Sequence, residues 1–247
     1  MWASTARVAL GYGATLVHAF AQRGLLRQEA VNAALWRQIH FTGLQGLPYV
    51  ALVALLFGAI VVTQALEFLG PDNEVALQAV VWGGIRELGP LVAALVIVVR
   101  SSVAIAAEVA LMRLREVISD EIWKDAVHEE EVVLPRVLGV SISAVLLVAY
   151  FQCIAIGAAL LATSFTLGSP LAAEFDHFLS NASWWQVPLS LGKSALMGTG
   201  IAAIACYHGL QVGRDVRDIR KAVVAAGIGS LTYVMVVDLL AALLLLA

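Results

Sequence analysis

Long apolar runs separated by short polar stretches dominate this chain of 247 residues. A helix needs roughly 20 apolar residues to cross the hydrocarbon core of a bilayer. Five runs reach that length, at 41–66, 75–99, 137–173, 184–207 and 222–247. The third run is longer than one crossing, so it is expected to hold a span followed by an outer loop. The pattern therefore predicts an all-α membrane protein with five transmembrane helices.

The first forty residues lack such a run and carry a different pattern. Val31, Leu35, Trp36 and Ile39 recur at helical spacing, with polar residues elsewhere on the helical wheel. This spacing predicts an amphipathic helix, which either lies at the cytoplasmic membrane interface or packs on the bundle. The short apolar core and small-residue cleavage site of a signal peptide are missing, so no cleavable leader is expected.

No repeat, low-complexity tract or linker divides the sequence, so a single domain is predicted over residues 1–247. Its first part, 1–40, is expected to form cytoplasmic or interfacial helices. The remainder, 41–247, is expected to form the five-span bundle. The longest polar stretch, 100–136, is expected to be a cytoplasmic loop of that bundle.

Lysine and arginine residues gather in alternate connections between the predicted spans. Of the 15 in the chain, four precede the first span, five lie between the second and third, and four lie between the fourth and fifth. The other two, Arg86 and Lys193, lie inside spans. Because cytoplasmic loops carry the excess of basic residues, the N-terminus is predicted to be cytoplasmic and the C-terminus to lie outside.

Composition narrows the classes of function. Hydrophobic residues make up 61% and charged residues 13%, whereas soluble domains carry about a quarter charged residues. An ordinary soluble enzyme is thereby excluded. The net charge of −3 has the wrong sign for nucleic-acid binding. The two cysteines, Cys153 and Cys206, lie in apolar runs, so neither a metal site nor a redox motif is expected.

Four charged residues interrupt the predicted spans: Arg86, Glu87, Lys193 and Asp238. A charge at the bilayer centre costs on the order of 3 kcal/mol on insertion scales, so these side chains need partners. Arg86 and Glu87 are expected to pair poorly with each other, because sequence neighbours point about 100° apart on a helix. Glu87 and Lys193 are expected to approach one another directly or through a ligand. The sequence leaves open whether the group faces a substrate or forms a structural network.

Three other features of the spans bear on function. Gly89 and Pro90 follow the charges of the second span and are predicted to form a kink and a hinge. Gln64 near the end of the first span is a candidate for substrate contact, with helix–helix hydrogen bonding as the alternative. The Gly-Lys-Ser run around Lys193 resembles the tail of a phosphate-binding loop, but Val187 stands where that motif needs glycine. No nucleotide site is therefore expected in this chain.

The predicted cytoplasmic loop carries a second candidate site. Residues 101–112 are expected to continue the second span as a helix. A short amphipathic helix is predicted beyond it, because carboxylates suit a helix start and apolar residues follow at helical spacing. Such a helix can insert into a groove on a partner protein, with a solvated loop as the alternative. The residues predicted to make this contact are Asp120, Glu121, Ile122, Trp123, Asp125 and Ala126.

From about residue 35 onwards, the sequence resembles the MlaE family of ABC-transporter permeases. The most similar stretch is IRELGPLVAALVIVVRSSVAIAAEVALMRLREVIS, residues 85–119. It matches the family's RELGP run, the arginine that precedes small residues, and the acidic residue shortly before a methionine. The matching positions are Arg86 to Pro90, Arg100, Glu108, Met112, Pro135, Arg136, Lys193 and Asp238.

This resemblance implies a function and a set of partners. Such permeases look like five-span proteins of the bacterial inner membrane with an N-terminal interfacial helix. They form dimers, bind two cytoplasmic ATPase subunits through the loop after the second span, and meet a periplasmic MCE protein. They move phospholipid or a similar apolar lipid between the inner membrane and the outer envelope, through a cavity at the dimer interface. ATP and magnesium belong to the ATPase, so this chain is expected to hold no cofactor and to be no enzyme.

Two cytoplasmic regions depart from the family pattern. Ser101 and Ser102 follow Arg100 where glycine is usual, and the loop reads SDEIWKDAVHEEEVV from Ser119. These differences leave open a homodimer or a heterodimer with a more typical permease. A different class of function also stays open, namely a carrier or channel driven by an ion gradient. In that case Glu87 and Asp238 are the expected protonatable sites.

Overall fold

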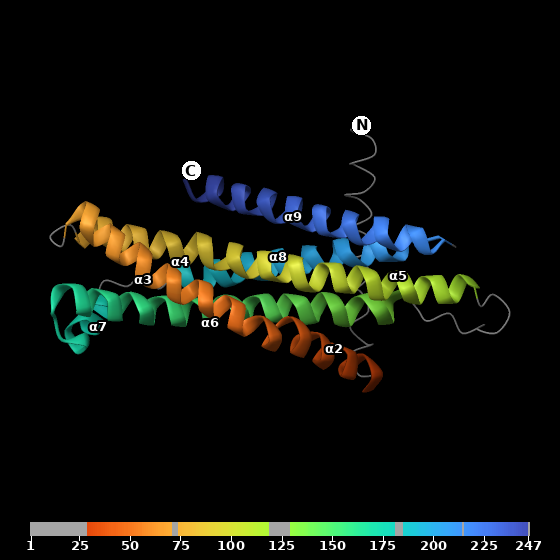
Figure 1. Ribbon diagram of the computed structural model, residues 1–247, viewed down its shortest axis with the longest axis horizontal. Coiled ribbons are helices and arrows are strands. Elements are labelled where there is room, and N and C mark those ends of the chain that lie inside the picture. The colour runs from red at the N-terminus through yellow and green to blue at the C-terminus, as the bar shows by residue number, and fades with distance from the viewer. Residues whose placement is uncertain (1–28, 71–73, 119–128, 181–184, 214, 247) are drawn as a thin grey trace.

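The computed structural model describes residues 29–70, 74–118, 129–180, 185–213 and 215–246. Within these ranges every regular element is helical (Figure 1). The elements are α2 (Glu29–Thr42), the short 3₁₀ helix η2 (Leu44–Gly46), α3 (Leu47–Leu69), α4 (Glu74–Ile97), the π-helical segment η3 (Val98–Ser102), α5 (Val103–Ile118), α6 (Glu129–Leu167), α7 (Leu171–Ser180), α8 (Gln186–Leu210) and α9 (Val216–Leu246).

The long helices run side by side in alternating directions (Figure 1). The start of α2, the end of α5, the start of α6 and the turn from α8 to α9 share one end of the bundle, called here the α5–α6 end. The other end, called the α7 end, holds α7, the end of α3 and the start of α4. Five stretches are long and apolar enough to cross a membrane: Val31–Phe68, Arg86–Leu114, Val132–Leu167, Gln186–Leu210 and Val216–Leu243. The prediction of a five-helix, multi-pass protein is confirmed.

The N-terminal part of the described chain forms the predicted helix, α2, which packs along α6. Gln38 is buried there and donates from Nε2 to Thr42 Oγ1 at 2.7 Å. A Cβ on Gly139 of α6 would lie 2.7 Å from the Gln38 side chain, so glycine permits the close crossing. Trp36 is 69% exposed on the opposite face. The structure thus shows packing on the bundle, and contact of Trp36 with a membrane interface stays a prediction.

The second predicted span is part of a much longer helical run. α4, η3 and α5 follow one another without a break from Glu74 to Ile118, as expected for residues 101–112. Pro90 lies inside α4, and the helix continues past it. The departure from α-helical geometry occurs later, in η3. The sequence did not lead us to expect this π-helical segment.

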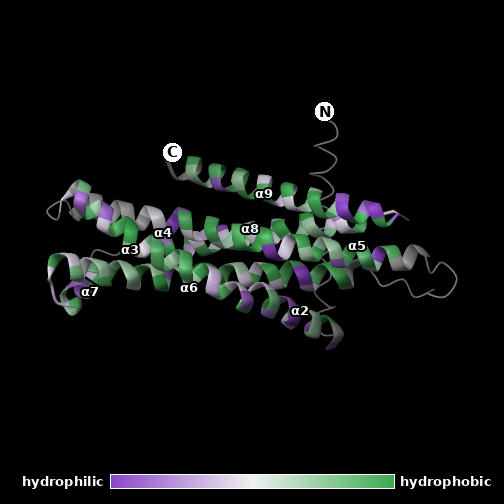
Figure 2. Cartoon of the chain, viewed as in Figure 1, coloured by the Kyte–Doolittle hydropathy of each residue, from purple (hydrophilic) through white to green (hydrophobic). Residues whose placement is uncertain are grey.

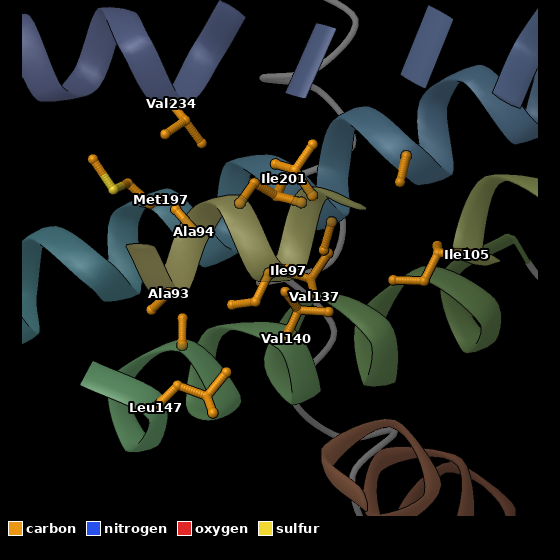
Figure 3. Packing of buried hydrophobic residues seen from close by; sticks show 14 of the residues in the cluster. Ala93, Ala94, Ile97, Ile105, Val137, Val140, Leu147, Met197, Ile201 and Val234 are labelled. Carbon is orange, nitrogen blue, oxygen red and sulfur yellow. The ribbon is translucent and has the colours of Figure 1, made fainter. Parts of the chain in front are cut away.

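The core is built from α3, α4, α5, α6 and α8, with α9 closing one side (Figure 3). Small and β-branched residues dominate it, which lets helix backbones approach closely inside a membrane protein. Buried residues at the centre include Ala93, Ala94, Ile97, Val137, Val140, Leu147, Met197, Ile201 and Val234.

The outward faces of the helices are also apolar (Figure 2). α9 shows this most clearly, because only 17% of its most apolar 18-residue stretch is buried. Ile228 and Leu239 are 63% and 61% exposed on it. Apolar residues on the outside of a helical bundle suit contact with lipid or with another membrane subunit. Polar residues concentrate towards the helix ends and on α2 (Figure 2).

The connection between the third and fourth spans is more ordered than the loop expected from the sequence. α6 continues to Leu167, and a separate short helix, α7, follows. Gly168 has φ of +67°, a conformation that glycine adopts readily, and it allows the sharp turn between the two helices. Ser169 Oγ donates to Glu174 Oε1 at 2.6 Å and holds the start of α7 in place.

Candidate functional site

The four charged residues of the spans form one continuous ion-pair network. Lys193 of α8 lies between two carboxylates, binding Glu87 Oε2 of α4 and lying 2.7 Å from Asp238 Oδ1 of α9. Arg86 Nε lies 3.0 Å from the other oxygen, Oε1, of Glu87. Three helices that are far apart in sequence are thereby joined by charges of alternating sign. The expected approach of Glu87 to Lys193 is confirmed, and each of the four charges has a partner of opposite sign.

One expectation about these charges was wrong. Arg86 and Glu87 do pair, although they are neighbours in sequence. The long arginine side chain can turn back along the helix, so the 100° between the two Cα–Cβ directions does not keep the groups apart. Each carboxylate oxygen of Glu87 therefore has its own cationic partner.

Burial differs across the network and marks its centre. The side chain of Lys193 is only 7% exposed, whereas those of Arg86, Glu87 and Asp238 are 23%, 27% and 24% exposed. A buried ammonium group is tolerated only when opposite charges compensate its lost hydration. The two carboxylates supply that compensation, which leaves Lys193 as the shared centre of the site.

The network lies towards the α7 end of the bundle. Lys193 lies about two turns after α8 begins at Gln186. Asp238 lies a similar distance before α9 ends at Leu246. The ion pair between them requires the same depth for both side chains. Both side chains therefore lie nearer the α7 end than the middle of their helices.

The predicted hinge residues follow the network directly on α4. Gly89 and Pro90 are both buried, and a Cβ on Gly89 would lie 3.2 Å from Phe151 Cδ1 of α6. Proline has no N–H, so Pro90 cannot donate to the main-chain oxygen of Arg86 one turn earlier. This local gap in the hydrogen bonding lies next to the charges. A hinge motion here stays a prediction.

Gln64 is separate from the charge network. Its side chain is exposed on α3, and within the described ranges no hydrogen bond joins it to Glu87 or Lys193. The structure of the single chain therefore does not group Gln64 with the other predicted substrate contacts.

A second polar cluster joins α5 to α6 at the α5–α6 end. Arg136 Nη2 donates to Glu108 Oε2 at 3.2 Å and lies 4.0 Å from the Met112 sulfur. Arg136 Nη1 also donates to the main-chain oxygen of Val132 at 2.9 Å. The cluster brings together three motif residues that the sequence could not place in contact. It fixes the two helices on either side of the predicted coupling loop.

The predicted coupling loop between α5 and α6 is the other candidate site. The six residues predicted to contact a partner, from Asp120 to Ala126, fall within 119–128 and lie outside the described residues. Across the described part of the chain, no group of three His, Cys, Asp or Glu side chains is placed to hold a metal ion.

Arg100 is a contact residue whose role sequence reasoning missed. It donates from Nη1 to the main-chain oxygen of Gln45 and from Nη2 to Gln45 Oε1 at 3.0 Å. Its guanidinium also lies over the rings of Tyr49 and Phe41, 5.2 Å and 5.8 Å from their centroids. In the sequence, Arg100 is a single arginine near the predicted end of a span, and nothing in that position indicates a contact with η2.

Comparison with known proteins identifies the family of this chain. A family model described as Permease MlaE matches residues 35–244. A probable ABC transporter permease protein of Rickettsia conorii is 27% identical over 235 residues, covering 94% of this chain and 91% of the relative. A probable ABC transporter permease protein of Rickettsia typhi is 26% identical over 205 residues, covering 82% and 79%. The matched region contains both polar clusters and all five membrane helices, and the chain belongs to the MlaE permease family.

Proposed function

We propose that this chain is the membrane subunit of an ABC transporter that moves phospholipid, or a similar apolar lipid, between the inner membrane and the outer envelope. The observation that carries the proposal is the ion-pair network centred on Lys193 within an MlaE-family bundle. A polar site within apolar walls suits a ligand that has a charged headgroup and acyl chains. The expected substrate contacts are Gln64, Arg86, Glu87, Lys193 and Asp238.

Within this network, Arg86 is the cation best able to meet an anionic headgroup. Lys193 is almost fully buried and shared by two carboxylates, whereas Arg86 is 23% exposed and uses Nε for Glu87. No described residue accepts a hydrogen bond from its two terminal nitrogens. A guanidinium with two such nitrogens can bind a phosphate through a pair of hydrogen bonds.

The proposed assembly follows the family pattern. A second permease copy, identical or related, would complete the cavity beside the exposed apolar faces. A cytoplasmic ATPase would bind ATP and magnesium and dock on the loop around Trp123, and a periplasmic MCE protein would meet the α7 end. The α5–α6 end then faces the cytoplasm, with the N-terminus inside, the C-terminus outside and the protein in the bacterial inner membrane.

Purification from native membranes tests this assembly. The tagged chain is extracted in mild detergent, and native mass spectra are recorded of every component that co-purifies. Two permease chains, two ATPase chains, an MCE protein and bound phospholipid are expected. The masses also distinguish a homodimer from a heterodimer. A permease oligomer that repeatedly lacks an ATPase would contradict the proposal.

Replacing Trp123 with Ala tests the coupling loop. We expect the variant to lose most of its co-purifying ATPase while its helical content and thermal unfolding stay unchanged, because a large apolar side chain in a groove dominates such contacts. Trp36→Ala, at an exposed tryptophan of α2, provides the control and should retain the ATPase. Equal ATPase recovery from all three proteins would count against the coupling role.

Two carboxylates on one lysine also favour a second candidate, the ion-coupled carrier. Protonation of Glu87 or Asp238 would release Lys193 from one partner and could be linked to transport. This candidate predicts lipid or solute movement in vesicles that contain the permease alone, driven by a pH gradient. Transport that requires ATP and the ATPase, at any gradient, would exclude it.

A further inference from the structure

The π-helical segment η3 is anchored to both neighbouring parts of the bundle by polar side chains. On one side, Arg100 binds both oxygens of Gln45 in η2. On the other side, Ser102 Oγ lies 2.8 Å from Ser230 Oγ of α9 and donates to the Ala226 main-chain oxygen at 3.4 Å. The segment is therefore fixed to both the first and the fifth membrane helices.

Burying polar side chains of η3 inside an apolar bundle costs free energy. Ser101 and Ser102 are buried, and Ser101 Oγ has no hydrogen-bond partner among the described residues. A π-helical turn holds one more residue than an α-helical turn, and such turns are rare without a functional or structural cause. The hydrogen bonds of Arg100 and Ser102 offset that cost and stabilise the π-helical turn.

The geometry of η3 sets how the two halves of the second span face their neighbours. If η3 closed to an α-helical turn with the same residues, α4 would rotate by about 100° and advance by about 1.5 Å relative to α5. Glu87 lies on α4, about three turns before η3, and now faces Lys193. A rotation of that size would carry its carboxylate away from Lys193.

We propose that Arg100 is a positioning residue that holds η3 in its π-helical register and thereby keeps Glu87 on Lys193. Its two hydrogen bonds and two ring contacts tie the register to the junction of α2 and α3. Movement of that junction is then transmitted along α4 to the charge network. The proposal extends the permease function above, but it concerns a contact within one chain and needs neither substrate nor ATPase.

Zero-length cross-linking measures this contact in the full chain. A membrane-permeant carbodiimide joins a carboxylate to an adjacent amine as an amide, and mass spectrometry of digested membranes quantifies each cross-linked peptide. In Arg100→Gln, we expect the Glu87–Lys193 product to fall about tenfold, because charge-assisted hydrogen bonds that stabilise the register are lost. The Asp238–Lys193 product should stay the same or rise, since neither residue lies on α4.

Deletion of Val99 separates a register effect from general damage. Val99 is 73% exposed in η3, and removing one residue from a π-helical turn leaves an α-helix with both flanks in their present orientation. In this background Arg100→Gln should no longer lower the Glu87–Lys193 product. Arg220→Gln, at an exposed position of α9, is the control for loss of one positive charge.

Three results would overturn the proposal. They are an unchanged Glu87–Lys193 product in Arg100→Gln, an equal loss of both cross-links, and failure of the Val99 deletion to restore the product. Each cross-linking result can be measured whether or not the chain transports lipid. The test of Arg100 therefore does not depend on the proposed substrate.

Discussion

Replacing Lys193 with Met is expected to destabilise the bundle by about 3–5 kcal/mol, the usual cost of removing one partner from a buried ion pair. The substitution leaves Glu87 with only Arg86 and leaves Asp238 without its cationic partner. Lipid transport should be lost as well. Thermal and denaturant unfolding in detergent, followed by circular dichroism, measures the change in stability.

The double variant Lys193→Met/Asp238→Asn provides the matched control. It removes one charge of each sign and leaves the Arg86–Glu87 pair intact, so the network stays neutral. Most of the lost stability should return. If transport also returns, the Lys193–Asp238 pair is structural, and if only stability returns, at least one of these two side chains acts in transport. A double variant as unstable as the single one would contradict the ion-pair account.

Gly58→Ala is expected to lower the free energy of unfolding by about 2 kcal/mol, within the range found for overpacked cores. A Cβ at this position would lie 2.3 Å from the main-chain oxygen of Ala155 and 2.9 Å from the Cβ of Ala158. Neither neighbour is the flexible end of a long side chain. α3 and α6 must therefore move apart along their contact.

Gly157→Ala on α6 is the control for this prediction. No heavy atom lies within 4 Å of a Cβ placed there, so alanine meets open space. Its stability should stay within about 1 kcal/mol of the wild type, and alanine's higher helix propensity favours a small gain. Equal losses from both substitutions would contradict the prediction, because Gly157→Ala meets no neighbouring atom and the crossing of α3 with α6 would not explain its loss.

The number and approximate extent of the membrane helices were predictable from the sequence, because apolar length is a strong signal. The charge network was also predictable in outline, since opposite charges inside spans have few stable places except beside each other. The sequence does not show which glycines permit close helix contacts. Gly58, Gly198 and Gly200 lie at such contacts, whereas Gly192 faces open space.

Other features depended on tertiary contacts that a sequence does not display. The π-helical turn at η3 is held by Gln45 and Ser230, which lie 55 and 128 residues from Arg100 and Ser102. The helix α7 was taken for a loop because, at ten residues, it is far shorter than the apolar length that identifies a membrane helix. The pairing of Arg86 with Glu87 was missed because Cα–Cβ directions were used without the reach of the side chain.

The order of charges along the chain bears on how the protein enters a membrane during synthesis. Arg86 and Glu87 emerge together from the ribosome and already neutralise each other in α4. Lys193 follows in α8, when Glu87 is in place to receive it, and Asp238 comes last, when Lys193 is in place. Each charged helix that leaves the translocon thus finds its counter-charge already inserted, and the chain need not hold an isolated charge in lipid while it waits for a later helix.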